Sequence, residues 1–205
     1  MRLPVPQDPD SSLTIDFVGG AVGYRLRAGE GTRQPLARAC GLTAAQLPMI
    51  VDATAGLGRD AFFLASLGAS ITLIERSPQV HQALARAMAA AREQGGELAG
   101  IIDRMTLVMG DSREVLPGLA PDVVLVDPMH PERRKTALVK KQMRDLRDVV
   151  GPDTDAHALM EVALASARRR VVLKWPLRAD PIAGLRRPSH QIVGKTTRYD
   201  VFVTG

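Results

Sequence analysis

Short apolar segments alternate with helical segments along most of the chain. Apolar runs that predict buried strands lie near 49–54, 70–75, 105–109, 123–127 and 170–174. Helices are expected near 59–67, 78–93, 112–118 and 154–167. Strands that alternate with helices in this way predict a parallel, doubly wound sheet with right-handed crossovers. The predicted fold class is therefore α/β and Rossmann-like.

The pattern changes after the fifth strand. Two further strand segments, 191–193 and 199–203, are separated only by residues 194–198. Because this connection is too short for a crossover helix, the two strands should pair antiparallel. The mostly parallel sheet is thus expected to end with an antiparallel C-terminal strand, which the usual dinucleotide-binding fold lacks.

The first part of the chain predicts a small extension. Residues 13–17 and 21–26 flank two glycines and favour a hairpin, after a Pro- and Asp-rich stretch expected to be mobile. A short helix is expected over 33–40, ended by Gly41. We therefore divide the chain into an N-terminal extension, 1–45, and one domain, 46–205.

The length, composition and charge of the chain limit the kinds of protein that it can be. The chain has 205 residues, 45% of them hydrophobic, which suffices for one α/β core. A net charge of +5 suits an anionic partner. No apolar run approaches the roughly 20 residues that span a membrane, and the N-terminus lacks the apolar core of a secretory signal. Cys40 is the only cysteine, so a disulfide within the chain and a thiolate metal cluster are both excluded. We expect a cytoplasmic protein.

A glycine-bearing turn follows the first strand. Gly56 and Gly58 allow close approach of a ligand to the backbone, and the helix that Arg59 and Asp60 open offers unpaired N–H groups. Asp60 has a structural alternative, because an acid is favourable in a first helical turn. The turn alone is a weak signal, and Ala61 could complete a dinucleotide fingerprint, so an NAD(P)-dependent oxidoreductase stays open.

Acidic residues end the next strands. Glu75 is placed to accept both ribose hydroxyls of a nucleotide-like cofactor. Asp111 and Ser112 could contact an adenine, although either could instead cap the following helix. Acids at the ends of strands one to four, without a phosphate clamp, suit a cationic sulfonium cofactor better than a pyrophosphate.

Asp127 and Pro128 follow the fourth strand and predict a rigid acceptor platform. Proline fixes its own φ and lacks an N–H, so the neighbouring carbonyls are aimed, as an exocyclic amine of a nucleobase requires. An acid at this position is costly to bury unless something pairs with it. A basic run beyond His130 suggests that the base arrives on a phosphate backbone, unless the run is only a solvated helix face. Its members are Arg133, Arg134, Lys135, Lys140, Lys141 and Arg144.

Lys174 ends the fifth strand, at the edge of the sheet where ligands bind in α/β proteins. It could anchor a phosphate of the flipped nucleotide or pair with Asp127. A purely structural pair with a neighbouring acid is about equally supported.

These motifs together resemble a known family. The order of D-A-T-A-G-L-G-R-D-A, L-I-E-R-S-P, G-D-S and D-P-M-H-P resembles class I S-adenosylmethionine-dependent methyltransferases. Residues 127–144, D-P-M-H-P-E-R-R-K-T-A-L-V-K-K-Q-M-R, are similar to the RsmJ family, which methylates guanine N2 in small-subunit ribosomal RNA. Further similarity runs through V-G-P-D-T-D-A, R-V-V-L-K-W-P and R-Y-D-V-F.

The resemblance implies a cofactor, a substrate and a site. The cofactor would be S-adenosyl-L-methionine, and the partner 16S ribosomal RNA or the small ribosomal subunit. The resemblance implies cofactor contacts by Gly56, Gly58, Arg59, Asp60, Glu75, Arg76, Asp111, Ser112 and Asp127. No metal is required.

In the expected chemistry, Asp127 and the carbonyl after it accept the two N–H groups of the guanine amine. The base leaves its stack at a cost of a few kcal/mol. His130 stands where the family usually has Phe and could stack on the base. A non-catalytic RNA-binding protein on the same scaffold is the remaining alternative.

Overall fold

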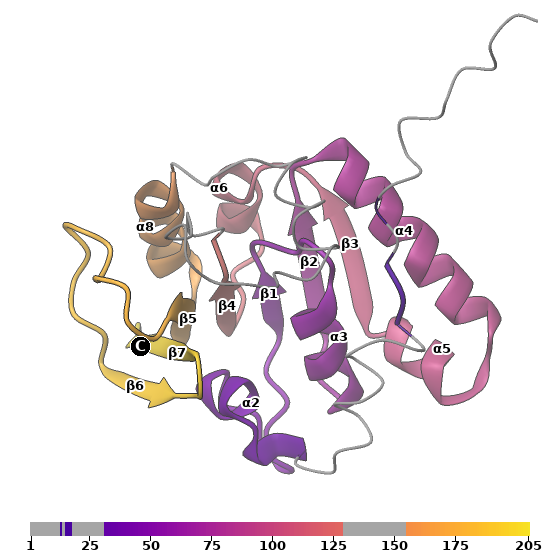
Figure 1. Ribbon diagram of the computed structural model, residues 1–205, viewed down its shortest axis with the longest axis horizontal. Coiled ribbons are helices and arrows are strands. Elements are labelled where there is room, and N and C mark those ends of the chain that lie inside the picture. The colour runs from indigo at the N-terminus through magenta and orange to yellow at the C-terminus, as the bar shows by residue number, and fades with distance from the viewer. Residues whose placement is uncertain (1–12, 14, 18–30, 129–154) are drawn as a thin grey trace, which may run out of the picture.

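The computed structural model describes residues 13, 15–17, 31–128 and 155–205. These residues form a seven-stranded sheet in the order β3-β2-β1-β4-β5-β7-β6 (Figure 1). The strands are β1 Ile50–Asp52, β2 Ile71–Glu75, β3 Met105–Met109, β4 Val123–Val126, β5 Arg170–Pro176, β6 His190–Val193 and β7 Thr197–Val203. Strands β1 to β5 pair in parallel, and β7 is antiparallel to both β5 and β6. The predicted α/β class and the antiparallel C-terminal strand are confirmed.

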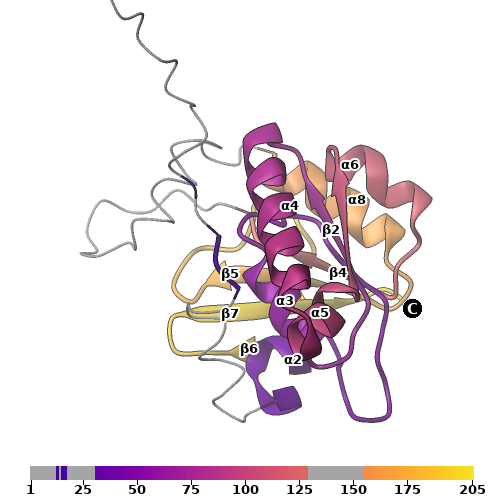
Figure 2. The same cartoon turned by 90° about the vertical axis from the view of Figure 1, so that its right-hand side faces the viewer.

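Helices cover both faces of the sheet. Their bounds are η1 Gly31–Arg33, α2 Pro35–Ala39, α3 Arg59–Ser66, α4 Pro78–Glu93, α5 Gly96–Ile102, α6 Ser112–Val115, η2 Leu116–Gly118 and α8 Ala156–Ser166. Figure 2 shows α2, α3, α4 and α5 on one face, and α6 and α8 on the other. The strand order reverses between β1 and β4, and ligands of open α/β sheets bind beside the carboxyl ends of the strands at such a point.

Most predicted helices form close to their expected bounds. Helix α4 begins at the predicted residue, where the Ser77 side chain accepts the Val80 N–H and Pro78 takes the first helical position. The helix predicted over 112–118 divides into α6 and the 3₁₀ turn η2, which contains Pro117. Helix α5 was not predicted. Glycines at 95, 96 and 100 lower the helix propensity of this segment, so its sequence does not indicate a helix. Burial of Ile101 and Ile102 stabilises the helix in the fold.

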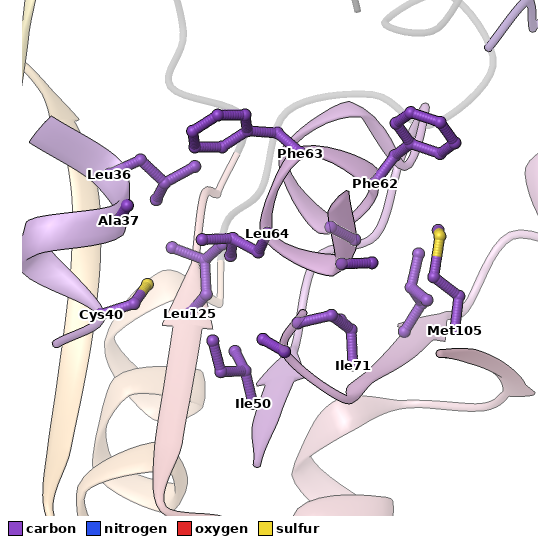
Figure 3. Close-up of a cluster of buried hydrophobic side chains, with 14 of the residues drawn as sticks. Leu36, Ala37, Cys40, Ile50, Phe62, Phe63, Leu64, Ile71, Met105 and Leu125 are labelled. Carbon is purple, nitrogen blue, oxygen red and sulfur yellow. The ribbon is translucent and has the colours of Figure 1, made fainter. Parts of the chain in front are cut away.

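Each face of the sheet has its own apolar core. Side chains of a strand alternate between the faces, so Val123 and Leu125 pack toward α3 while Val124 and Val126 pack toward α8. Figure 3 shows the α3 side, where Leu64 points toward Leu125, while Phe62 and Phe63 extend from the side of the helix away from Ile50 and Ile71. All of these side chains belong to the same buried cluster. Ring stacking between Phe17 and Phe62, with centroids 4.8 Å apart, extends this core.

The described part of the N-terminal extension packs into the same core. Helix α2 contributes Leu36 and Ala37 to it, and Cys40 follows (Figure 3). Gly41, in the left-handed region at φ 73°, lies against the Arg170 guanidinium and ends the helix as predicted. The hairpin predicted over 13–26 falls largely outside the described residues, and the boundary at 45/46 stays a prediction.

The segment after β5 is fixed by a buried arginine. Arg198 pairs with Asp200 at 3.1 Å and donates to the carbonyls of Pro176, Leu177 and Ala179. Every donor of a buried guanidinium needs such an acceptor. These contacts fix the chain directly beyond Lys174. Among the helices of the described residues, none is both long and apolar enough to cross a membrane.

Candidate active site

Strand alternation brings three charged residues to one side of the sheet. Asp52 shares its strand face with Ile50, Asp127 continues the face of Leu125, and Lys174 that of Val172. Since Ile50, Leu125 and Val172 pack on the α3 side, the charged residues also lie toward α3. The first turn of α3 carries Asp60. The carboxyl ends of β1, β4 and β5 and the start of α3 therefore form one charged cluster.

Lys174 connects two carboxylates of this cluster. Its Nζ donates to Oδ2 of Asp127 at 2.6 Å and to Oδ2 of Asp60 at 2.5 Å. Among the alternatives left open for Lys174, the pairing with Asp127 is observed, and Asp60 is a second partner that the sequence did not identify. A direct contact of Lys174 with a phosphate, and of Asp60 with the cofactor, stay predictions.

Charges in the cluster influence one another strongly. Burial disfavours the Lys174 ammonium, but the two carboxylates outweigh it and raise the pKa of Lys174 above its usual value. Desolvation raises the pKa of Asp127, Lys174 opposes that rise, and the like charge of Asp60 adds to it. Asp127 is thus an acceptor whose charge depends on its two neighbours.

Thr54 holds the backbone of Asp127. The Asp127 N–H donates to Thr54 Oγ1 at 2.7 Å, and Pro128 is buried beside it. Asp52 in turn accepts the Thr54 N–H at 3.1 Å. Burial raises the pKa of Asp52 to about 7. Neither hydrogen bond of Thr54 was predicted. In the sequence Thr54 is only one hydroxyl-bearing residue in a loop, and nothing there indicates its partners.

Glu75 shapes the glycine turn. It is buried, and its Oε2 accepts the Gly56 N–H at 2.9 Å while Oε1 accepts the Ser77 N–H at 2.8 Å. Each carboxylate oxygen has a second lone pair, so both can also accept ribose hydroxyls. Gly58, at φ 65°, precedes α3, and a Cβ there would lie 2.8 Å from Leu84 Cδ1. The turn, its buried acid and the helix start therefore fit a nucleoside-bearing cofactor.

Asp111 caps α6, which confirms the structural alternative given to it. It accepts the Arg113 N–H at 2.9 Å, and the Arg113 guanidinium binds both of its oxygens, at 3.0 and 2.5 Å. These contacts lower the pKa of Asp111. Ser112 is buried and donates its hydroxyl proton to the Ala53 carbonyl at 2.6 Å. Adenine binding by Asp111 and Ser112 stays a prediction.

The other predicted site residues divide into two groups. Arg76 lies beside Glu75 and pairs with Asp155 at 2.9 Å, where Asp155 also pairs with Arg113 at 3.1 Å. Arg59 is the first residue of α3. The second group lies outside the described residues and comprises His130, Arg133, Arg134, Lys135, Lys140, Lys141 and Arg144. Within 13–128 and 155–205, as far as these are described, no three His, Cys, Asp or Glu side chains are grouped to hold a metal ion.

Comparisons with known proteins agree with this geometry. The model of a family of SAM-dependent methyltransferases matches residues 2–204. Ribosomal RNA small subunit methyltransferase J of Brucella anthropi is 65% identical over 193 residues, which are 94% of this chain and 94% of that protein. The protein of the same name from Rhodopseudomonas palustris is 63% identical, covering 94% of this chain and 88% of that one. A crystal structure of a SAM-dependent methyltransferase from Neisseria gonorrhoeae is similar with a TM-score of 0.73 and 33% identity, over 94% of this chain and 74% of that chain.

Proposed function

This chain belongs to the ribosomal RNA small subunit methyltransferase J family of S-adenosylmethionine-dependent enzymes, and from that membership we propose that it methylates the exocyclic N2 of a guanine in 16S ribosomal RNA. Membership in a methyltransferase family favours methyl transfer over the hydride transfer of an NAD(P) enzyme. It also favours catalysis over RNA binding alone. The substrate is the RNA or the small subunit that contains it, in the cytoplasm.

The observation that carries this proposal is the placement of Asp127. Its carboxylate lies at the carboxyl end of β4, beside the reversal of strand order, and its side chain is 41% exposed. Its backbone is fixed by Thr54 and its carboxylate by Lys174. An acceptor held in this way, at the edge where a cofactor binds, suits an amine that must be oriented before it reacts.

The cofactor would be held by residues of β1, β2 and the turn between β1 and α3. Glu75 would accept ribose hydroxyls, Gly56 and Gly58 would admit the ligand to the backbone, and Asp111 would accept from the adenine amine. Arg59, Asp60, Arg76 and Ser112 belong to the same proposed surface. When bound, S-adenosylmethionine supplies an electrophilic methyl group attached to a sulfonium.

Asp127 would prepare the guanine amine for that methyl group. The nitrogen lone pair is delocalised into the purine ring, so the amine is a poor nucleophile. Acceptance of its N–H groups by the Asp127 carboxylate and by the carbonyl after it localises the lone pair toward the methyl. Alignment supplies most of the acceleration, since effective molarities of oriented groups reach about 10⁵ M or more. The amine proton then leaves to Asp127 or to solvent.

The RNA would be held by the basic run and by His130. Arg133, Arg134, Lys135, Lys140, Lys141 and Arg144 are proposed phosphate ligands. His130 is proposed to stack on the flipped guanine in place of the usual Phe. A phosphate contact by Lys174 stays part of this proposal.

Nucleoside mapping tests the proposed function directly. Ribosomal RNA from cells with and without this protein is digested and compared by mass spectrometry, with Asp127→Asn as the inactive control. We expect N2-methylguanosine at one 16S position to disappear with the gene, to return with the parent chain and to stay absent with Asp127→Asn. Identical modification in both strains would refute the function, and full restoration by Asp127→Asn would refute the role of Asp127.

A further inference from the structure

We propose that Lys174 is a positioning residue for methyl transfer, which Asp60 holds in place and which in turn holds the Asp127 carboxylate ready to accept the amine. The inference rests on the proposed function of Asp127 and adds two residues to it. Lys174 lies on β5 and Asp60 on α3, so neither neighbours Asp127 in sequence. Both reach it through one ammonium group.

The register of the sheet places Lys174 beside Asp127. Val126, the last residue of β4, pairs with Leu173 of β5. The residues that follow them, Asp127 and Lys174, therefore lie next to each other. Beyond Lys174 the chain is anchored by the contacts of Arg198. A lysine has several rotatable bonds and costs entropy to order. Two short ion pairs and a fixed backbone offset that cost, so the ammonium is held in one place.

Exposure gives the two carboxylates different roles. The Asp60 side chain is 12% exposed, Lys174 23% and Asp127 41%. The cluster therefore opens outward from Asp60 through Lys174 to Asp127. A substrate amine that enters from solvent reaches Asp127 first, and Asp60 stabilises Lys174 from the inner side. An ammonium has three N–H donors, and two of them are used in this arrangement.

Charge balance explains why a lysine is needed. Among the described residues, the charged groups that face Asp127 are Lys174 from β5, Asp60 from α3 and Asp52 from β1. The buried Cys40, at the end of α2, lies near Asp60 and Asp52. Without Lys174, the remaining charges of this described cluster are acids like Asp127 itself, and they would favour its protonated form. A protonated carboxyl is a donor at one oxygen and a weaker acceptor. Lys174 keeps Asp127 in the form that accepts the amine.

Two substitutions should therefore shift the acid limb of the pH–rate profile in opposite directions. Lys174→Met removes the cation, so the acid limb of the rate profile should shift to higher pH, with turnover near neutral pH at least tenfold lower and partly recovered in alkali. Asp60→Asn removes a like charge and keeps an acceptor, so the acid limb should shift to lower pH. Affinity for S-adenosylhomocysteine should stay within a few-fold for Lys174→Met. A merely structural role would lower activity at every pH without opposite shifts.

The experiment measures pH–rate profiles on 16S ribosomal RNA and the ¹³C carboxyl titration of Asp127 in labelled protein. Matched controls are Arg92→Met and Asp103→Asn, because these residues form an exposed ion pair on α4 and after α5. Opposite shifts in the Lys174 and Asp60 variants, absent from the controls, support the proposal. Shifts in the same direction, or none in Lys174→Met, overturn it. If the parent chain methylates no ribosomal RNA, the proposed function fails, and the Asp127 titration still decides whether Lys174 and Asp60 control its charge.

Discussion

The hydroxyl oxygen of Thr54 accepts the backbone N–H of Asp127 at 2.7 Å, across 73 residues of sequence. This contact joins the loop after β1, which shapes the cofactor turn, to the residue proposed to hold the substrate amine. Asp52, the last residue of β1, accepts the N–H of the same threonine and so fixes the start of this loop. The backbone directly before the glycine turn is thereby hydrogen-bonded to Asp127.

Thr54→Val should damage catalysis more than cofactor binding. Valine has nearly the same shape but no acceptor, so the Asp127 N–H loses its partner, which costs about 1–3 kcal/mol for a buried group. We expect turnover to fall about tenfold, with S-adenosylhomocysteine affinity within a few-fold in titration calorimetry. Thr54→Ser keeps the oxygen and should retain most activity. Equal activity of the valine and serine variants would contradict this role.

Glu75→Ala should weaken cofactor binding and loosen the turn together. The substitution removes the proposed ribose acceptor and also the partner of two backbone N–H groups. Hydrogen bonds to a charged group contribute about 1.5–3 kcal/mol each, so we expect at least tenfold weaker S-adenosylmethionine binding and a lower melting temperature. Glu93→Ala, at the exposed end of α4, is the matched control. Unchanged affinity by calorimetry would remove Glu75 from the cofactor site.

Replacing Lys140, Lys141 and Arg144 together by Gln should weaken RNA binding without changing cofactor affinity. Each lost phosphate contact should reduce the slope of log affinity against log salt by about 0.7–0.9. The variant Arg92→Gln with Arg104→Gln removes exposed charges of α4 and of the turn after α5, and serves as a control. Binding isotherms at several salt concentrations measure the slope. A slope equal to that of the parent chain would show that the basic run does not contact phosphates.

The sequence predicted most of this fold because its signals are local. Four-residue apolar runs such as Val123–Val126 and the capped start of α4 at Ser77 are visible without knowledge of any neighbour. Helix α5 was missed, since its stabilisation comes from burial of Ile101 and Ile102 under the sheet and not from local propensity.

The sequence named candidate residues for the site, but among their contacts it suggested only the pair of Lys174 with Asp127 and the helix cap by Asp111. Asp60 and Lys174 are 114 residues apart, and they meet only because β5 lies beside β4 and α3 packs on that face. An alternation of strands and helices does not specify this order of strands. Asp111 differs, because its partner Arg113 is only two residues away. This local pairing competes with the adenine contact that the position of Asp111 suggests.

Asp52→Asn should stabilise the fold above neutral pH and leave it little changed in acid. Burial raises the pKa of Asp52 to about 7, while the acid in the unfolded chain keeps its usual value near 3.8. The folded state therefore binds the proton more tightly. This contribution to stability is complete below about pH 4 and is lost as pH rises toward 7. Above that range Asp52 of the parent chain is either charged in a buried position or protonated against the solution pH, and both cost free energy. Asparagine at this position carries no charge and does not titrate.

The difference in unfolding free energy between Asp52→Asn and the parent should grow from about pH 4 to pH 7 and then level off. Each pKa unit corresponds to about 1.4 kcal/mol, so the rise from 3.8 to about 7 corresponds to a gain on the order of 4 kcal/mol near pH 8. Asparagine can still accept the Thr54 N–H, so the loop itself should be retained. Urea unfolding across this range measures the difference, with Asp103→Asn as the exposed control. Because only the difference between the two chains is compared, carboxylates that do not interact with Asp52 cancel. A difference that does not change with pH would show that Asp52 titrates as it does in the unfolded chain.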